Sequence, residues 1–311
     1  MTVVLDLSGL SVVFISFDEP NAEANHAVLR AMVPGVVRVH GVKGFDAAHR
    51  KAAGTARTAH VITVDGDNVV TDPDFFTRRL RFMPQDLTSV ISFSARSHHN
   101  ALAYGNGGIK IWPRPLLASL RSHEATHDGA LAVDFAWRVP YVQAQGVPSD
   151  SLVTASPFQA FRAGLREGVR LTMNGGIAAV AAYPGMAPAA ALQRHIDKSA
   201  LERLRIWCSV GRDVENGAFA MLGARIGCVF AMLEVFDIGK IADFGWVADF
   251  WSSRVLPSVR HDADLAAELQ RYGTRLRNDL GLVVDDLCPS ASAFAKSIYH
   301  PPMRLGTLVP R

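Results

Sequence analysis

The chain has 311 residues, of which 49% are apolar and 20% are charged, and its formal net charge at pH 7 is +3. This composition is typical of a globular protein with a sizeable core and excludes a disordered or fibrous chain. The small positive charge permits an anionic partner without requiring one. The three cysteines, Cys208, Cys228 and Cys288, are widely spaced and show no metal-binding spacing. We therefore expect free thiols in a reducing compartment.

No stretch of the sequence predicts a targeting signal or a membrane span. Residues 1–8 lack a basic segment and carry Asp6 among their apolar residues, unlike a secretory signal. The alanine-rich stretch 177–192 is interrupted by Pro184 and Pro188, and it is too short to cross a bilayer. We therefore expect an intracellular protein without a membrane partner.

The first quarter alternates between apolar runs typical of strands and segments typical of helices. Residues 12–17 form the first predicted strand, and Pro20 suits the first turn of the helix that follows. A second strand is predicted at 36–39, a helix with a small alanine face at 44–58, and a third strand at 61–64. This order predicts an α/β fold with a doubly wound, mostly parallel sheet. No glycine-rich phosphate fingerprint follows the first strand, which argues against a dinucleotide-binding or P-loop protein.

The remaining elements are mostly helical. Asp72 and Pro73 predict the start of a short basic helix that ends near Arg81, and residues 90–96 predict another strand. A long helix should begin at Ser156-Pro157. Further helices are predicted at 198–208, 218–235, 246–255 and 263–280. Because no linker composition appears, we expect an α/β core over 1–150 and a mostly helical subdomain over 151–311 packed on it.

The third strand ends in the sequence Asp65-Gly66-Asp67-Asn68. Carboxylates at the carboxyl end of such a strand lie where open α/β sheets bind ligands. Two aspartates separated by one residue can hold a hard divalent cation, magnesium or manganese, which neutralises a diphosphate. The same four residues are also good turn sequence, so the pair alone leaves both interpretations open.

Two other segments are candidates for chemistry. Residues 104–114 contain Gly105, Gly107 and Gly108, and glycines allow a backbone to approach a ligand closely, although a plain turn is equally compatible. Asp134 stands among apolar residues, where an acid is either paired, here with Arg138, or functional.

Several separated stretches together resemble the GT-A glycosyltransferases. Residues 17–21, 41–49 and 64–68 are similar to the opening half of that fold. Residues 104–114, 156–162 and 207–213 resemble the phage members of the group that includes base J glucosyltransferase, which glycosylate hydroxymethylated pyrimidines in DNA. The resemblance extends to about Phe230. It implies a metal-dependent transferase with a nucleotide-sugar donor, such as a UDP-sugar, and double-stranded DNA with a modified pyrimidine as acceptor. It also implies a cytoplasmic location, in the host if the chain is phage-encoded.

The resemblance assigns roles to particular positions. Asp65 and Asp67 match the D-x-D pair that holds the metal against the donor diphosphate, and Asp18 or Glu19 would contact the nucleoside. Further donor contacts are implied for Gly107, Gly108 and Lys110, and either donor contacts or purely structural roles for His49 and Arg57. Asp134 lies where inverting members carry the acceptor base, and Asp213 is the second choice.

Other functions remain open from the sequence. The Glu-Asp doublet of many inverting members is missing, so retention and inversion are both possible. A GT-A enzyme with a glycan or other small acceptor and a non-catalytic nucleotide-sugar-binding protein are the alternatives. The DNA acceptor is favoured slightly by two arginine clusters, Arg78, Arg79 and Arg81, and Arg271, Arg275 and Arg277.

Overall fold

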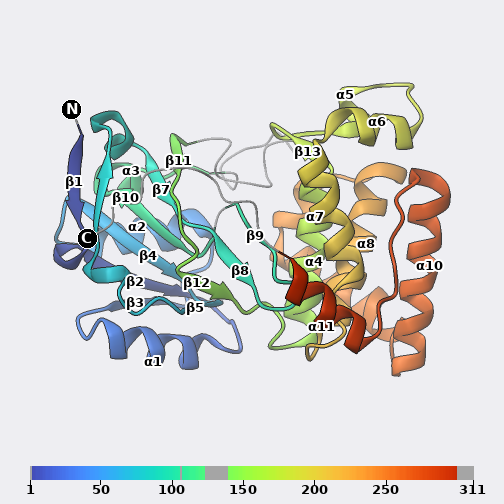
Figure 1. The fold of residues 1–311 in the computed structure, drawn as a ribbon, viewed down its shortest axis with the longest axis horizontal. Coiled ribbons are helices and arrows are strands. Elements are labelled where there is room, and N and C mark those ends of the chain that lie inside the picture. Colours follow the sequence, from blue (N-terminus) through green and yellow to red (C-terminus); the bar gives the residue numbers. More distant parts are fainter. Residues whose placement is uncertain (1, 106, 123–138, 300–311) are drawn as a thin grey trace. The chain divides into compact units, whose positions relative to one another are not determined.

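The computed structural model describes residues 2–105, 107–122 and 139–299 (Figure 1). These residues form two compact units, one made of the residues up to 122 together with 139–152, and the other of 153–299. The first unit is built from strands and helices, and the second is almost entirely helical.

A six-stranded sheet, in the order β11-β7-β10-β4-β2-β3, forms the centre of the first unit. Strands β3, β2 and β4 run parallel, β11 runs parallel to β7, and β10 is antiparallel to both of its neighbours. The predicted α/β class is therefore confirmed, with one antiparallel strand inside the sheet. The strands are β2 (Ser11–Ser16), β3 (Val37–His40), β4 (His60–Asp65), β7 (Val90–Ser92), β10 (Ile109–Pro113) and β11 (Tyr141–Gln143).

Helices α1 (Ala22–Met32) and α2 (Phe45–Thr55) pack on opposite faces of this sheet. Successive side chains of a strand point to opposite faces, so each strand contributes to both layers. On the α1 face, Ala22 and Leu29 join a core that contains Phe14, Ile62, Val64, Ile109 and Ile111. On the other face, the ring of Trp112 lies against His49 of α2, at 5.3 Å between centroids. The predicted helices on both sides of the sheet are thus present.

Smaller elements complete the first unit. A four-stranded sheet has the order β5-β12-β8-β9, and β1 pairs with β6 in a separate ribbon. Their bounds are β1 (Val3–Asp6), β5 (Asn68–Val70), β6 (Arg79–Phe82), β8 (Ala95–Ser97), β9 (Ala103–Tyr104) and β12 (Ser149–Ser151). The helical segments are η1 (Leu7–Gly9), η2 (Phe75–Thr77), η3 (Pro84–Thr88) and α3 (Arg114–Ala118).

The prediction of a basic helix that starts at Asp72 is wrong. Only the short turn η2 forms there, and β6 follows it, paired antiparallel with β1. Arg79 and Arg81 are exposed while Leu80 and Phe82 are buried, which is the period of two that a strand requires. The strand predicted over 90–96 is also divided between β7 and β8, which belong to different sheets.

The second unit consists mainly of helices, and the predicted ones are present. Ser156 caps α4 by accepting a hydrogen bond from the Gln159 amide, and α10 ends at Gly281, which adopts φ +60°. Helix α10 begins at Asp262, one residue before the predicted start, and His261 precedes it. The elements are α4 (Pro157–Arg170), β13 (Met173–Asn174), β14 (Ile177–Ala178), α5 (Ala179–Ala182), α6 (Pro188–His195), α7 (Lys198–Ser209), α8 (Gly217–Leu233), η7 (Ile238–Ala242), α9 (Phe244–Phe250), η8 (Trp251–Val255), η9 (Leu256–Ser258), α10 (Asp262–Leu280) and α11 (Pro289–Ile298).

Helix α8 is the centre of this unit and is buried along most of its length. Arg225, in its middle, is fully buried and donates to the carbonyl oxygens of Cys208, Leu269 and Asp285. A buried guanidinium is tolerated because these acceptors and the carboxylate of Asp286, 2.8 Å away, satisfy it. Within the described residues, the helices are all too short or too polar to cross a membrane.

Candidate functional site

Asp65 and Asp67 lie at the carboxyl edge of the six-stranded sheet. Asp65 is the last residue of β4 and stands beside Ile15, near the carboxyl end of the parallel strand β2. Its amide donates to the carbonyl oxygen of Gly108 at 2.9 Å, which continues the pairing with β10 to the strand end. Asp65 is 32% exposed at its side chain. This edge is where open α/β sheets bind ligands.

Glu19 reaches the same edge from the turn after β2. Its Oε2 accepts a hydrogen bond from the Phe17 amide at 2.8 Å. A Cβ placed on Gly66 would lie 2.7 Å from that Oε2, so the Glu19 carboxylate lies directly against the backbone between the two aspartates. Asp18, in the same turn, is exposed. The structure therefore brings Glu19 against the Asp65–Asp67 turn, with Asp18 beside it in sequence.

Lys110 contributes a positive charge to this group from β10. Its Nζ lies 2.8 Å from Oδ2 of Asp65, and its side chain is only 3% exposed. Lys110 pairs with Thr63 across β10 and β4, so its side chain lies on the same face as Thr63 and Asp65. A buried ammonium of this kind requires a carboxylate partner, which Asp65 supplies.

His49, on α2, lies close enough to this pair for their charges to affect its titration. Its Nδ1 lies 2.9 Å from the carbonyl oxygen of Phe45, which can only accept, so Nδ1 carries the proton. Nε2 is buried and has no hydrogen-bond partner within the described chain. Burial lowers the pKa of His49 to about 4, against an opposing effect of the Asp65 charge. The ring is therefore neutral at pH 7 and adds no charge to the site.

Gly107 and Gly108 are required by close packing. A Cβ on Gly108 would lie 2.1 Å from Cγ of Asn68, and one on Gly107 would lie 2.3 Å from the Ala95 amide nitrogen. These contacts account for both glycines without a ligand. Their place beside a donor sugar remains a prediction.

The backbone of Arg57 lies away from this group, as the structural alternative for that residue would have it. Its amide donates to the hydroxyl of Ser11, the first residue of β2, which places it at the amino edge of the sheet. His49 lies within α2, and Arg57 follows the end of the helix, after the chain has crossed from the carboxyl edge of the sheet to its amino edge.

Neither candidate base belongs to the described residues of the first unit. Asp134 lies outside the described residues, and its role stays a prediction. Asp213 belongs to the second unit, where Lys296 of α11 lies 2.5 Å from its Oδ2. Its other oxygen, Oδ1, is buried without a hydrogen-bond partner in the described chain. The ion pair provides a structural explanation for Asp213.

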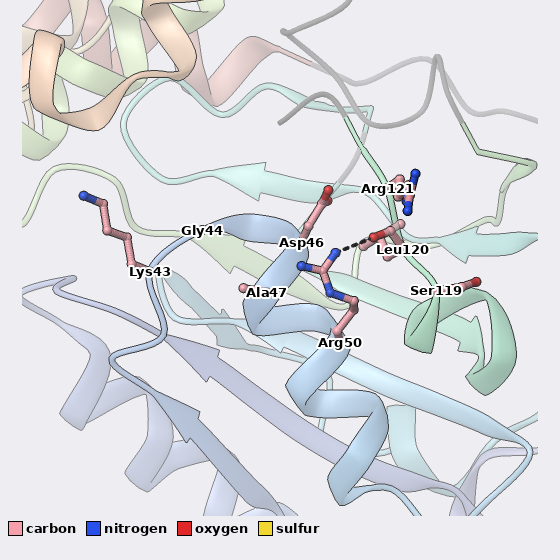
Figure 2. A pocket seen from close by; sticks show the side chains of 8 residues that line it. All are labelled: Lys43, Gly44, Asp46, Ala47, Arg50, Ser119, Leu120 and Arg121. Carbon is pink, nitrogen blue, oxygen red and sulfur yellow. Dashed lines mark hydrogen bonds between the residues drawn. The ribbon is translucent and has the colours of Figure 1, made fainter. Parts of the chain in front are cut away.

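A basic pocket of about 580 Å³ opens at the start of α2, and sequence reasoning missed it (Figure 2). Arg50 donates to the Leu120 carbonyl oxygen at 2.7 Å, and the Asp46 carboxylate accepts from the Ser122 amide. These bonds fix the segment after α3 against the helix. The lining is formed by Lys43, Gly44, Asp46, Ala47, Arg50, Ser119, Leu120 and Arg121. Its three basic side chains come from segments about 70 residues apart, so no local pattern reveals it.

A divalent cation fits the carboxyl edge only in part. Magnesium and manganese are commonly held by one or two carboxylates, with phosphates and water supplying the other ligands. Asp67 offers such a carboxylate, and its Oδ1 accepts from the neutral amide of Asn68 at 2.8 Å. Asp65 already holds Lys110. Among the residues that the structure describes, no cluster of three or more acidic, histidine or cysteine side chains could hold a metal.

Both arginine clusters are largely neutralised by nearby acids. Arg78 pairs with Asp72 at 2.7 Å and Arg79 with Asp6 at 3.0 Å. In the second cluster, Arg271 pairs with Glu268, Arg275 pairs with Glu234, and Arg277 donates to the Val284 carbonyl oxygen. The argument for a DNA acceptor from these clusters is therefore weakened, because paired arginines present less net charge to phosphates.

Comparison with known proteins finds distant likeness only to solved structures. No protein-family model and no curated protein matches the chain. Among solved structures, a mannosyltransferase from Pyrobaculum calidifontis in complex with GDP-Man and Mn²⁺ is similar at 13% identity. The match covers 87% of this chain and 88% of that one, with a TM-score of 0.34. A score of this size is too low to decide either the fold family or the activity.

Proposed function

We propose that the protein is a GT-A-like glycosyltransferase that uses a nucleotide-sugar donor, bound at the carboxyl edge of β2 and β4. The observation that carries the proposal is the convergence there of Asp65, Asp67 and Glu19. The basic pocket at the start of α2 supports it, because a nucleoside diphosphate is an anion of suitable size for such a pocket. The resemblance of the sequence to GT-A enzymes points to the same donor.

In this proposal each group has a separate task. Glu19 and the neighbouring Asp18 bind hydroxyl groups of the nucleoside, and Asp67 holds a manganese or magnesium ion. When bound, that ion would stabilise the negative charge of the diphosphate leaving group. A carboxylate, Asp134 by resemblance, removes the proton of the acceptor hydroxyl, which typically contributes about 10²–10⁴-fold to the rate.

The proposal also concerns the identity of the acceptor, the molecule that receives the sugar. The resemblance favours a hydroxymethylated pyrimidine in double-stranded DNA, while the local ion pairs of both arginine clusters favour a glycan or other small acceptor. A protein that binds DNA through phosphates should lose affinity steeply as salt rises, and one with another acceptor should not bind DNA at all.

Donor binding and transfer can be tested together. Calorimetric titration with UDP, GDP and their sugars, with and without manganese, should identify one nucleotide that binds. Incubation of that nucleotide-sugar with hydroxymethylcytosine-containing DNA, followed by mass spectrometry of the nucleosides, tests the acceptor. Asp67→Asn should abolish transfer with little change in melting temperature, and Arg57→Gln is the matched control that should keep full activity. Absence of nucleotide binding under every condition would refute the proposed function.

A further inference from the structure

A second pocket, of about 390 Å³, lies along one face of α10, and all of its lining residues belong to the second unit. We call it the α10 pocket. Most of its lining is polar or charged, contributed by Arg212, Gln270, Thr274, Arg277 and Asp286. The three residues from α10 are spaced by four and three positions, which places them on one side of the helix. Arg212 comes from the turn between α7 and α8, and Asp286 from the segment between α10 and α11.

The two arginines of the α10 pocket lack an acidic partner within the described residues. Other arginines of α8 and α10 are each paired with an aspartate or glutamate, namely Arg225, Arg271 and Arg275. Arg277 instead donates to the Val284 carbonyl oxygen at 3.2 Å, and Arg212 is half-buried without an ion pair or hydrogen bond to the described chain. The planar donor fork of a guanidinium matches the oxygens of a phosphate. The pocket therefore offers two positive charges that no ion pair compensates.

The walls of the α10 pocket are held in place by hydrogen bonds of the protein itself. The Asp285 amide donates to the hydroxyl of Ser209 at 3.0 Å, which fixes the segment after α10. Next to Arg212, the Gly211 amide donates to the hydroxyl of Ser292 at 3.4 Å. A site that is already formed loses little conformational entropy when a ligand binds.

Asp286 adds a hydrogen-bond acceptor to this basic pocket. Its Oδ1 lies 2.8 Å from Nη1 of Arg225, which compensates its charge. The side chain is 40% exposed, and its other oxygen accepts no hydrogen bond from the described residues. An inorganic phosphate would use only the arginines, whereas an ester with hydroxyl groups would also use Asp286 and the side chains of Gln270 and Thr274. The volume is at the lower end of the range for small-molecule sites and exceeds what inorganic phosphate needs.

We propose that the α10 pocket binds a small phosphorylated sugar or polyol. Arg212 and Arg277 hold the phosphate, and Asp286, Gln270 and Thr274 bind hydroxyl groups of the organic part. This inference goes beyond the proposed function and does not depend on it, because the proposed donor site is made of residues of the first unit.

Calorimetric titration of the full chain at low ionic strength tests the ligand class. The probes are inorganic phosphate, glycerol 3-phosphate, ribose 5-phosphate and glucose 6-phosphate, with glucose as the uncharged control. At least one of the three esters should bind about tenfold or more tightly than inorganic phosphate, because only the esters use both kinds of group. Glucose should not bind. If none of the three esters binds, or if inorganic phosphate binds as tightly as the best of them, the proposal is wrong.

Substitutions then locate the bound ester. Arg212→Gln should weaken its binding about tenfold or more, and it should fold normally because Arg212 has no partner in the described chain. Thr274→Val should weaken binding of the ester but leave that of inorganic phosphate unchanged. Arg260→Gln is the matched control, since Arg260 is exposed and donates to the carbonyl oxygen of Pro257, and it should bind as the wild type does. A folded Arg212→Gln with wild-type affinity would overturn the proposal. No nucleotide enters these titrations, so a failure of the proposed function leaves their result decisive.

Discussion

Gly168 of α4 and Ala224 of α8 approach so closely that a Cβ on Gly168 would lie 2.1 Å from the Ala224 carbonyl oxygen. Equivalent close contacts recur along both helices, and glycines of each helix face the backbone of the other. Gly164 faces Ala220 in the same way, while Gly223 and Gly227 of α8 face the carbonyl oxygens of Phe161 and Leu165. Four glycines thus let two backbones pack together directly at the centre of the second unit.

We expect Gly168→Ala to destabilise the protein, although alanine favours helices by up to about 1 kcal/mol over glycine. The added methyl has to displace backbone, which typically costs about 1–3 kcal/mol or more. Gly54, in α2, is the matched control, since a Cβ there meets nothing within 4 Å. Gly54→Ala should be neutral or slightly stabilising in urea unfolding. Equal effects of the two substitutions would contradict the packing seen between α4 and α8.

His49 should make the protein less stable in acid. Its pKa falls to about 4 in the folded state from an ordinary value of 6.5, because the ring is buried. Between these two pH values the unfolded chain binds a proton that the folded chain does not, so stability decreases as the pH is lowered through that window. The full effect of such a shift is about 3 kcal/mol.

The pH dependence of urea unfolding measures this directly. His49→Phe, beside Phe45 and Trp112, should flatten the curve between pH 6.5 and 4. His26→Gln is a useful comparison, because burial also lowers the pKa of that less buried ring. It should flatten the curve less. A His49→Phe variant with the wild-type pH dependence would show that the ring does not titrate as expected.

Cys288 should be the reactive thiol of the protein. It is exposed, and hydrogen bonding by Ser290 lowers its pKa. Burial raises the pKa of Cys208 to about 12 and that of Cys228 well above its ordinary value, so neither forms thiolate readily. An aromatic disulfide reagent at neutral pH should therefore label one thiol rapidly in the native protein, and Cys288→Ser should remove that phase. A second rapid thiol in the variant would contradict the burial of the other two.

Asp213 and Lys296 should be energetically coupled if their ion pair has a structural role. The side chains are 14% and 18% exposed, so solvent screens the pair only in part. A double-mutant cycle with Asp213→Asn and Lys296→Met should give a coupling of about 1–3 kcal/mol in unfolding free energy. A coupling below about 0.5 kcal/mol, with kcat falling in Asp213→Asn alone, would favour Asp213 as a base.

Much of the fold could be predicted from local sequence. The apolar runs at 12–17 and 61–64 appear as β2 and β4, because a continuous buried strand needs apolar side chains on both faces. Ser156 and Gly281 mark helix ends through the hydrogen bonds and backbone angles of single residues. The turn that contains Asp65 and Asp67 could likewise be predicted at the end of a strand, because the sequence changes there from β-branched residues to aspartate and glycine.

Other features depend on segments that are distant in the sequence. The helix predicted near Arg79 is strand β6, because β1, about 75 residues earlier, supplies its hydrogen-bond partner. The sequence left either a donor contact or a structural role open for Arg57, and its backbone lies at the amino edge because the chain direction places the end of the α2 segment there.

The sequence by itself determined that two carboxylates stand at the end of β4 and in the turn that follows it. Only the tertiary structure decided that one of them holds a buried ammonium, because β10 returns antiparallel beside β4 and brings Lys110 to Asp65. The tertiary structure also brings α2 and the segment after α3 together, and these form the basic pocket. Local sequence patterns indicate which side chains of a segment are buried in the core and which are exposed to solvent. Which charges meet depends on strand order and chain direction, and these are set by packing between distant segments.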